Sequence, residues 1–129
     1  MNIGREYHTA SILSNGTVLV TGGQNGGGVL NSAELYDRTT GNWTTTKDMA
    51  VERCSHTASI LSNGAVLVTG GYNGAYLAST ELYDPSIGNW TTTGNMNIPR
   101  CFHTKSILLH GIVLVTGGRN GYLTSAELY

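Results

Sequence analysis

Charge, cysteine and long apolar runs are all scarce in this sequence. Only 12% of its 129 residues are charged, and the formal net charge is -1. No basic surplus is available to hold a polyanion, which argues against nucleic acid and an anionic membrane surface as partners. No run approaches the roughly 18 apolar residues of a membrane span, and the residues after Met1 lack the apolar core of a signal peptide. We therefore predict a soluble chain, with the cytoplasm as the favoured compartment.

The two cysteines, Cys54 and Cys101, have no metal-ligand spacing between them. They lie 47 residues apart, and the same spacing separates Trp43 from Trp90. The cysteines therefore occupy one equivalent position in two successive repeats. We interpret them as small structural side chains, in preference to a disulfide.

Glycine, by contrast, is abundant, with 18 residues, and most of the chain is an internal repeat. The segment that begins at Arg5 recurs from Arg53 and, more loosely, from Arg100. The histidines at positions 8, 56 and 103 give spacings of 48 and 47 residues. The extra residue of the first interval falls in the glycine-rich loop after Gly23, where added length is tolerated best. This period predicts an array of equal structural units.

Turn residues divide each repeat into four short strands. In the first repeat these strands are expected at His8 to Leu13, Val18 to Thr21, Ala33 to Tyr36 and from Trp43 onward. Asn15-Gly16 is typical of a hairpin with a type I′ turn, in which both central residues take positive φ. His110 stands in the place of that asparagine in the third repeat, and histidine tolerates the same region. The second strand is apolar without alternation, which predicts burial on both faces.

A four-stranded sheet covered on both faces needs a neighbour on each side, and equal units stacked around an axis supply these neighbours. A glycine pair, a tyrosine about a dozen residues later and a tryptophan seven residues after the tyrosine resemble the kelch motif. The positions are Gly22-Gly23, Tyr36 and Trp43, then Gly70-Gly71, Tyr83 and Trp90, then Gly117-Gly118 and Tyr129. We therefore predict an all-β fold of kelch-type β-propeller blades in an incomplete ring. Blade 1 is expected at about 5–47, blade 2 at about 53–94, and a three-stranded partial blade 3 at about 100–129.

Residues that recur in every repeat are explained most simply by what every blade needs. The motif glycines supply backbone freedom, and the motif aromatics bury large areas. The repeated histidines, with no carboxylate recurring beside them in ligand spacing, are interpreted as structural in preference to a metal site; they are His8, His56 and His103. The repeated glutamates are expected to pair with the repeated arginines; the glutamates are Glu34, Glu81 and Glu127. We predict no catalytic residue, no metal and no cofactor.

Positions that differ between repeats are better candidates for a binding site. In kelch proteins, which these repeats resemble, the loops after the second and fourth strands typically shape one binding face. Aromatic and arginine side chains on such loops are the types that dominate interface energetics. The candidate partner-binding residues are Tyr7, Tyr72, Tyr76, Phe102, Arg119 and Tyr122. Lys105, which replaces Ala10 and Ala58, is expected either in the central channel or on the outer surface.

The resemblance implies a non-catalytic scaffold that binds a protein partner. A glycan-binding propeller and a fragment of a copper enzyme resembling galactose oxidase stay open as alternatives, although the enzyme's copper ligands and Tyr-Cys pair are not apparent. The remaining alternative is a structural repeat array without a dedicated binding site. Both ends of the sequence fall inside the repeat pattern. We therefore expect that further blades, the favoured case, or a second copy of the chain must close the ring.

Overall fold

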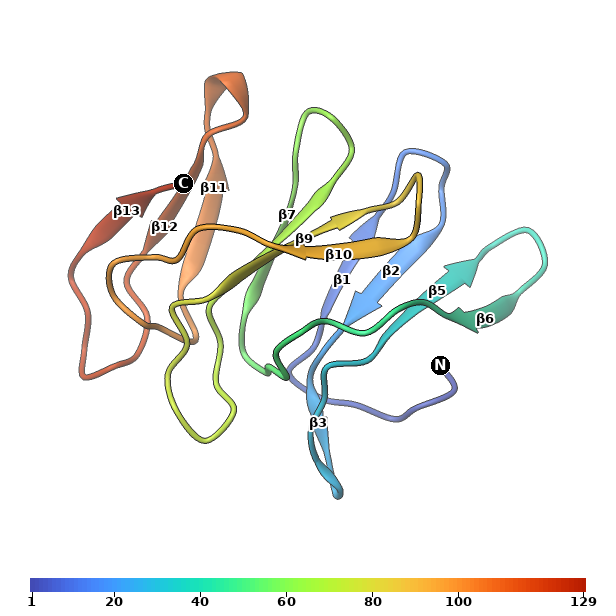
Figure 1. Ribbon diagram of the computed structural model, residues 1–129, viewed down its shortest axis with the longest axis horizontal. Coiled ribbons are helices and arrows are strands. Elements are labelled where there is room, and N and C mark those ends of the chain that lie inside the picture. The colour runs from blue at the N-terminus through green and yellow to red at the C-terminus, as the bar shows by residue number, and fades with distance from the viewer.

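Three antiparallel sheets follow one another along the chain in the computed structural model, which describes residues 1–129 (Figure 1). Blade 1 consists of β1 (Thr9–Ile12), β2 (Val18–Thr21), β5 (Ala33–Asp37) and β6 (Asn42–Thr45). Blade 2 consists of β7 (Thr57–Ile60), β8 (Val66–Thr69), β9 (Thr80–Asp84) and β10 (Asn89–Thr92). Blade 3 has three strands, β11 (Thr104–Ile107), β12 (Val113–Thr116) and β13 (Ala126–Leu128). The predicted all-β fold of two complete blades and one three-stranded blade is confirmed.

Within each blade, each strand after the first pairs with the strand that precedes it in that sheet. β2 has the predicted bounds, β1 is one residue shorter than predicted at each end, and β5 and β6 each differ from the prediction by one residue at one end. A short hairpin of β3 (Gln24–Asn25) and β4 (Gly28–Val29) was not predicted, because its glycine-rich sequence is equally typical of an open loop. The remaining element is a 3-10 turn at Leu109–Gly111, and the chain contains no helix that could span a bilayer.

The turn between the first two strands corrects one prediction. Gly16 has φ 82°, but Asn15 is not among the residues with positive φ, so the turn is not type I′. Instead, the N–H of Gly16 donates to the Leu13 carbonyl at 2.9 Å. This hydrogen bond closes a turn over residues 13–16 in which only Gly16 has a positive φ. The Asn15 side chain accepts from the N–H of Thr17 at 3.0 Å and favours this alternative. His110 does adopt the predicted positive φ, at 66°.

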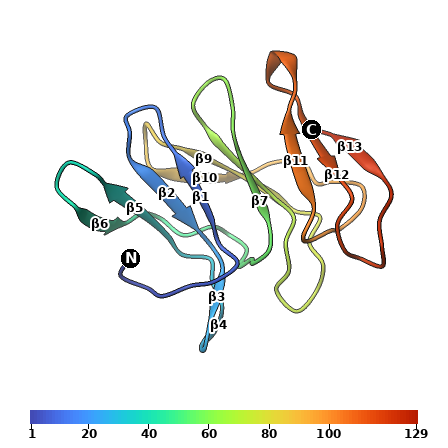
Figure 2. The ribbon, with the colours of Figure 1, turned by 180° about the vertical axis from the view of Figure 1, so that it is seen from behind.

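The sheets stand beside one another with their first strands innermost (Figures 1 and 2). A groove runs along these first strands, and its lining includes residues of β1, β7 and β11. Lys105 is part of that lining, together with Ala58 and Ile60, so the axial position is the correct one of its two predicted places. The sheets form part of a ring and leave it open.

The hydrophobic core lies between blades. Leucines of one blade meet valines of the next, as Leu19 does with Val66 and Val68 in the first cluster. Met49, from the segment that links the two blades, packs into the same cluster. The second cluster repeats the arrangement with Leu67, Val113, Val115 and Met96. In β8 the valines of one face, Val66 and Val68, and Leu67 of the other face are all buried, which confirms the predicted burial of the second strand on both faces.

A buried ion pair fastens the segment that enters each blade to its third strand. Arg53 donates to Glu81 at 2.8 Å, and the two side chains are 0% and 1% exposed. Glu81 also accepts the backbone N–H groups of Ala50 and Val51, at 2.7 and 3.0 Å. The other two pairs are Arg5–Glu34 at 2.9 Å and Arg100–Glu127 at 2.7 Å. The predicted pairing of repeated arginines and glutamates is confirmed.

The repeated histidines join neighbouring blades. His56 of blade 2 places Nε2 at 2.9 Å from the Thr9 hydroxyl and 3.2 Å from the Thr21 hydroxyl, both in blade 1. His103 of blade 3 reaches Thr57 and Thr69 of blade 2 at the same distances. Burial lowers the pKa of His56 to about 3 and that of His103 to about 4, so both imidazoles are neutral at pH 7. His56 and His103 therefore have the structural role that the sequence predicted, since each hydrogen-bonds to the preceding blade.

Candidate partner-binding site

One end of the blades gathers the loops that follow the second and fourth strands. Strands in a meander alternate in direction, so these two kinds of loop meet at the same end. In blade 2, Cys54 and Tyr72 exchange backbone hydrogen bonds of 3.0 and 2.9 Å across the two loops. Cys101 and Arg119 do the same in blade 3, at 3.2 and 2.7 Å. We call this the loop end, and its loops are held by backbone pairing.

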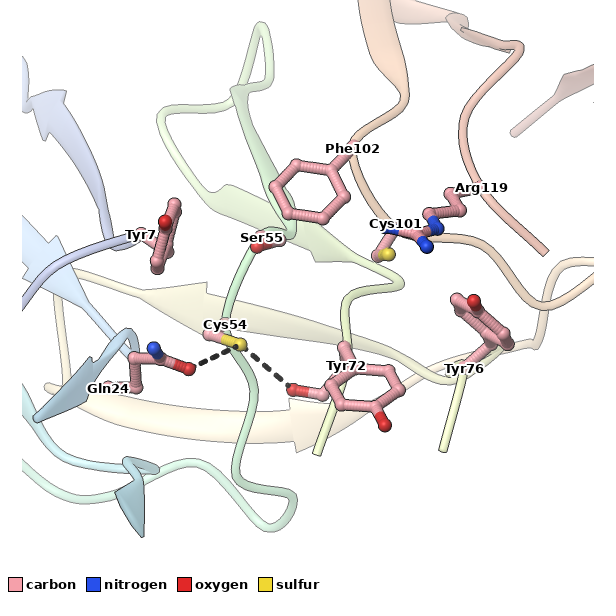
Figure 3. A pocket seen from close by; sticks show the side chains of 9 residues that line it. All are labelled: Tyr7, Gln24, Cys54, Ser55, Tyr72, Tyr76, Cys101, Phe102 and Arg119. Carbon is pink, nitrogen blue, oxygen red and sulfur yellow. Dashed lines mark hydrogen bonds between the residues drawn. The ribbon is translucent and has the colours of Figure 1, made fainter. Parts of the chain in front are cut away.

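A pocket of about 340 Å³ opens at the loop end (Figure 3). We call it the loop pocket, and its lining is Tyr7, Gln24, Cys54, Ser55, Tyr72, Tyr76, Cys101, Phe102 and Arg119. Five of the six residues named from the sequence as candidate partner-binding residues are in this lining. The sixth, Tyr122, is not; it is fully exposed and forms a backbone bridge with Arg119.

Aromatic rings surround the opening of the loop pocket. Tyr7 of blade 1 and Phe102 of blade 3 meet edge to face, with ring centroids 6.1 Å apart. Tyr72 and Tyr76 form a second edge-to-face pair at 5.5 Å. Tyr7 and Phe102 are 53% and 57% exposed. Large ring surface is therefore available to a ligand on opposite sides of the pocket, as Figure 3 shows.

Three equivalent residues reach the loop pocket through an unusual backbone conformation. Tyr7, Ser55 and Phe102 have φ of 54°, 54° and 51°, in the left-handed region that non-glycine residues seldom adopt. Their backbones are linked in series, because the Ser55 N–H donates to the Tyr7 carbonyl at 2.9 Å and the Phe102 N–H donates to the Ser55 carbonyl at 3.0 Å. Such strain costs about 1–3 kcal/mol per residue and persists only where surrounding contacts hold it. The three blades thus fix the aromatic rim jointly.

Polar and sulfur groups form the floor. The Cys54 Sγ lies 3.3 Å from the Tyr72 carbonyl and 3.6 Å from Gln24 Oε1, and Gln24 in turn donates to Glu6 at 2.9 Å (Figure 3). Burial raises the pKa of the Cys54 thiol, and burial likewise raises that of Cys101. Both cysteines are free thiols that stay protonated at neutral pH, which makes them poor nucleophiles.

Sequence reasoning did not select four residues of the lining, namely Gln24, Cys54, Ser55 and Cys101. A usable signal existed for two of them. Gln24 stands in the repeat column of Tyr72 and Arg119, and Ser55 stands in the column of Tyr7 and Phe102. When two residues at equivalent repeat positions are candidates for the binding site, the residue at the third equivalent position is expected to face that site too. The cysteines gave no such signal, because a recurring small residue is equally expected in a structural role.

Arg119 is the one charged side chain of the loop pocket lining. The side chain is exposed, and the two backbone hydrogen bonds with Cys101 hold the backbone of Arg119 in place. A guanidinium offers five donors, so the pocket combines aromatic surface with a site for an anionic or acceptor group. No three His, Cys, Asp or Glu side chains come together in the chain in a way that could hold a metal ion.

Comparison with protein families bears on these repeats directly. A family model described as the Kelch motif matches residues 7–50 and again residues 53–97. Together the two matches span more than half of the chain. The chain belongs to the kelch-repeat family. A comparison with curated proteins found no match.

The third kelch unit lies largely beyond the two matched segments, yet it repeats their contacts. Arg100 pairs with Glu127 as Arg53 pairs with Glu81, and His103 docks on blade 2 as His56 docks on blade 1. All three kelch blades therefore contribute residues to the loop pocket on equivalent scaffolds. The opposite end carries a second pocket of mainly polar turn residues, which include Asn15, Asn63 and Ser86, and its lining contains no aromatic ring.

Proposed function

We propose that this kelch chain is a non-catalytic scaffold that binds a protein partner at the loop end. The observation that carries the proposal is the loop pocket itself, whose lining combines aromatic rings from all three blades with one arginine. Exposed tyrosine, phenylalanine and arginine on a rigid scaffold are the residue types that concentrate binding energy at protein interfaces. Members of the kelch family commonly serve as interaction scaffolds, which agrees with this use.

The lining favours binding over catalysis. Its ionisable groups are the arginine, the tyrosines and two thiols whose pKa burial raises. The raised pKa keeps both thiols protonated near neutral pH, and the lining contains no histidine or carboxylate to serve as a general base. The Cys54 sulfur lies beside Gln24 and the Tyr72 carbonyl, and no histidine is present in the lining to activate either thiol.

The chemistry of the pocket indicates what the partner presents. An apolar or aromatic side chain fits between the edge-to-face pairs, while a carboxylate or backbone carbonyl accepts from Arg119. The volume of about 340 Å³ suits one or two side chains of a protein loop. We therefore expect the partner to insert an apolar residue next to an acidic one.

The test uses a displayed library of peptides that carry an aromatic residue beside Asp or Glu. Peptides are selected on the chain, and their affinity is then measured for the double variant Tyr72→Ala, Arg119→Ala. We expect a loss of about tenfold or more, because truncated interface anchors typically cost over 1 kcal/mol. Ile87→Ala is the matched control, since Ile87 is 69% exposed in the turn between β9 and β10 at the opposite end.

Unchanged affinity in the double variant would refute the proposal, provided that circular dichroism shows both variants folded. A parallel glycan array separates the remaining alternative. Tight glycan binding that the same double variant abolishes, together with no selectable peptide, would place a sugar in the pocket instead of a protein.

A further inference from the structure

Each junction between neighbouring blades repeats three polar contacts. The first is the imidazole of the later blade on two threonine hydroxyls of the earlier one. In the second, the later blade's arginine carbonyl accepts from a glycine N–H, as Arg53 does from Gly23 and Arg100 from Gly71, both at 2.9 Å. The third is the backbone bond between left-handed residues, from Ser55 to Tyr7 and from Phe102 to Ser55. The junction between blades 1 and 2 and the junction between blades 2 and 3 therefore show the same three polar contacts, and we expect any further junction to contain them.

The outer face of blade 3 carries the earlier-blade half of this pattern without a neighbour. The Thr104 and Thr116 hydroxyls bond to each other at 2.8 Å, and no imidazole of the chain reaches them. The N–H of Gly118 and the carbonyl of Phe102 likewise take no part in the backbone hydrogen bonds of the chain. All of these groups face a position equivalent to that of a following blade.

The apolar surface of blade 3 is open in the same direction. A Cβ on Gly22 or Gly70 would meet an arginine carbonyl of the next blade at 2.4 or 2.5 Å, whereas one on Gly117 would meet only Leu123 at 3.6 Å. Leu13 of blade 1 is 3% exposed under blade 2, but the equivalent Leu108 is 42% exposed. Leu128 is 65% exposed. Apolar surface of this extent is typical of an interface.

Blade 1 carries the later-blade half of the pattern, also unused. His8 forms no hydrogen bond through its side chain, whereas His56 and His103 both bond to threonine hydroxyls of the preceding blade through Nε2. The Arg5 carbonyl and the Tyr7 N–H take no part in the backbone hydrogen bonds of the chain. Each of the three contacts of the pattern thus has one half free on blade 3 and the matching half free on blade 1.

We propose that the outer face of blade 3 is a docking surface for blade 1 of a second copy of this chain. His8 of one copy would bind Thr104 and Thr116 of the other, and the Gly118 N–H would donate to the Arg5 carbonyl. The Tyr7 N–H would donate to Phe102, which extends the series of left-handed residues into the next copy. Two such junctions related by a two-fold axis give six blades, within the roughly four to eight of closed propellers. This inference does not depend on a ligand in the loop pocket.

The test measures the mass of the 129-residue chain by light scattering over a range of concentrations, with circular dichroism to monitor folding. We expect a folded dimer. His8→Ala weakens both of its junctions and should raise the dissociation constant roughly a hundredfold, about tenfold for each junction. The double variant Thr104→Val, Thr116→Val should act alike, because it keeps the β-branched shape and removes the hydroxyls. Ile87→Ala, which changes an exposed side chain of blade 2 away from both proposed junction faces, should leave the dimer intact.

A mixture of the two variants distinguishes head-to-tail docking from any other dimer. One junction of the mixed dimer joins two altered faces, but the other joins a normal His8 to normal threonines. The mixture should therefore associate more tightly than either variant alone. Leu128→Asp provides a variant with little risk to folding, since the side chain is exposed in the single chain and the dimer would bury a carboxylate.

Any of three results would overturn the proposal. One is a folded monomer at all concentrations. Another is a dimer indifferent to the His8, threonine and Leu128 changes, and the last is a mixture that associates no better than its components. A chain that only aggregates, without reaching a folded dimer, would be a fourth such result, because the proposal predicts that a second copy satisfies these faces.

Discussion

Two neutral imidazoles buried between blades make the stability of this chain depend on pH. His56 and His103 have pKa values of about 3 and about 4 in the folded chain, mainly because burial disfavours their charged forms. In the unfolded chain both return to the ordinary value of 6.5. Between pH 6.5 and 5 the unfolded state therefore binds more protons than the folded state, so stability falls as the pH falls.

The size of this effect follows from the two values. Each imidazole costs about 1.4 kcal/mol per pH unit in the window where only its unfolded form is protonated. From pH 6.5 to 5 this amounts to roughly 2 kcal/mol per histidine, or about 4 kcal/mol together. A loss of that size is a large part of the 5–15 kcal/mol typical of a small domain.

The assay is urea unfolding, followed by circular dichroism, at pH 7, 6 and 5. Titration of Glu34 and Glu127 does not interfere in this range. Burial raises the pKa of Glu34 and Glu127, but backbone N–H donors and the paired arginines outweigh burial and lower both pKa values below the ordinary 4.5. Stability that depends on these carboxylates is complete above pH 4.5 and is lost only as the pH falls further.

A variant assigns the pH effect to its source. His56→Gln should be less stable than the natural chain at pH 7, yet it should lose only about half as much stability between pH 7 and 5. An unfolding free energy that is equal at pH 7 and pH 5 would refute the reasoning. So would an undiminished pH slope in His56→Gln.

Two further variants test what holds a blade together. Glu81→Ala leaves a buried guanidinium unpaired and should cost about 3–5 kcal/mol in the unfolding free energy, whereas Glu127→Ala should cost less because Glu127 is 11% exposed; equal losses by urea unfolding would contradict this. Gly70→Ala would place a Cβ 2.5 Å from the Arg100 carbonyl at φ 60°, so we expect a loss of about 3 kcal/mol. Gly26→Ala, with open space around its Cβ and no positive φ, is the control and should change the stability by only about 0.5 kcal/mol by thermal melts.

The repeat explains why so much of the fold could be predicted from the sequence. A position that recurs every 47 or 48 residues must satisfy the same neighbours each time, so the pairing of Arg53 with Glu81 and the burial of Val66 follow from the pattern. The turn at Asn15-Gly16 was predicted less well. The pattern indicates a hairpin there, but the Asn15 side chain can bond to the backbone of Thr17 and so favours a different turn.

The candidate site was predictable only in part. Variation between repeats selected five residues of the loop pocket, since the fold brings variable loop residues of all blades to one end. The same reasoning included Tyr122, whose side chain stays fully exposed beyond the lining. It omitted Cys54 and Cys101, because their contribution to the floor depends on how the loops of each blade pair with each other. Such pairing between distant residues is a property of the folded chain.

A crystal structure of the chain with a selected peptide tests the proposed function most directly. The account predicts that an apolar side chain of the peptide is buried between the rings of Tyr72 and Phe102, with a peptide acceptor within hydrogen-bond distance of the Arg119 guanidinium. A peptide bound at the opposite end, among the turns around Asn63 and Ser86, with the loop pocket left free, would contradict it.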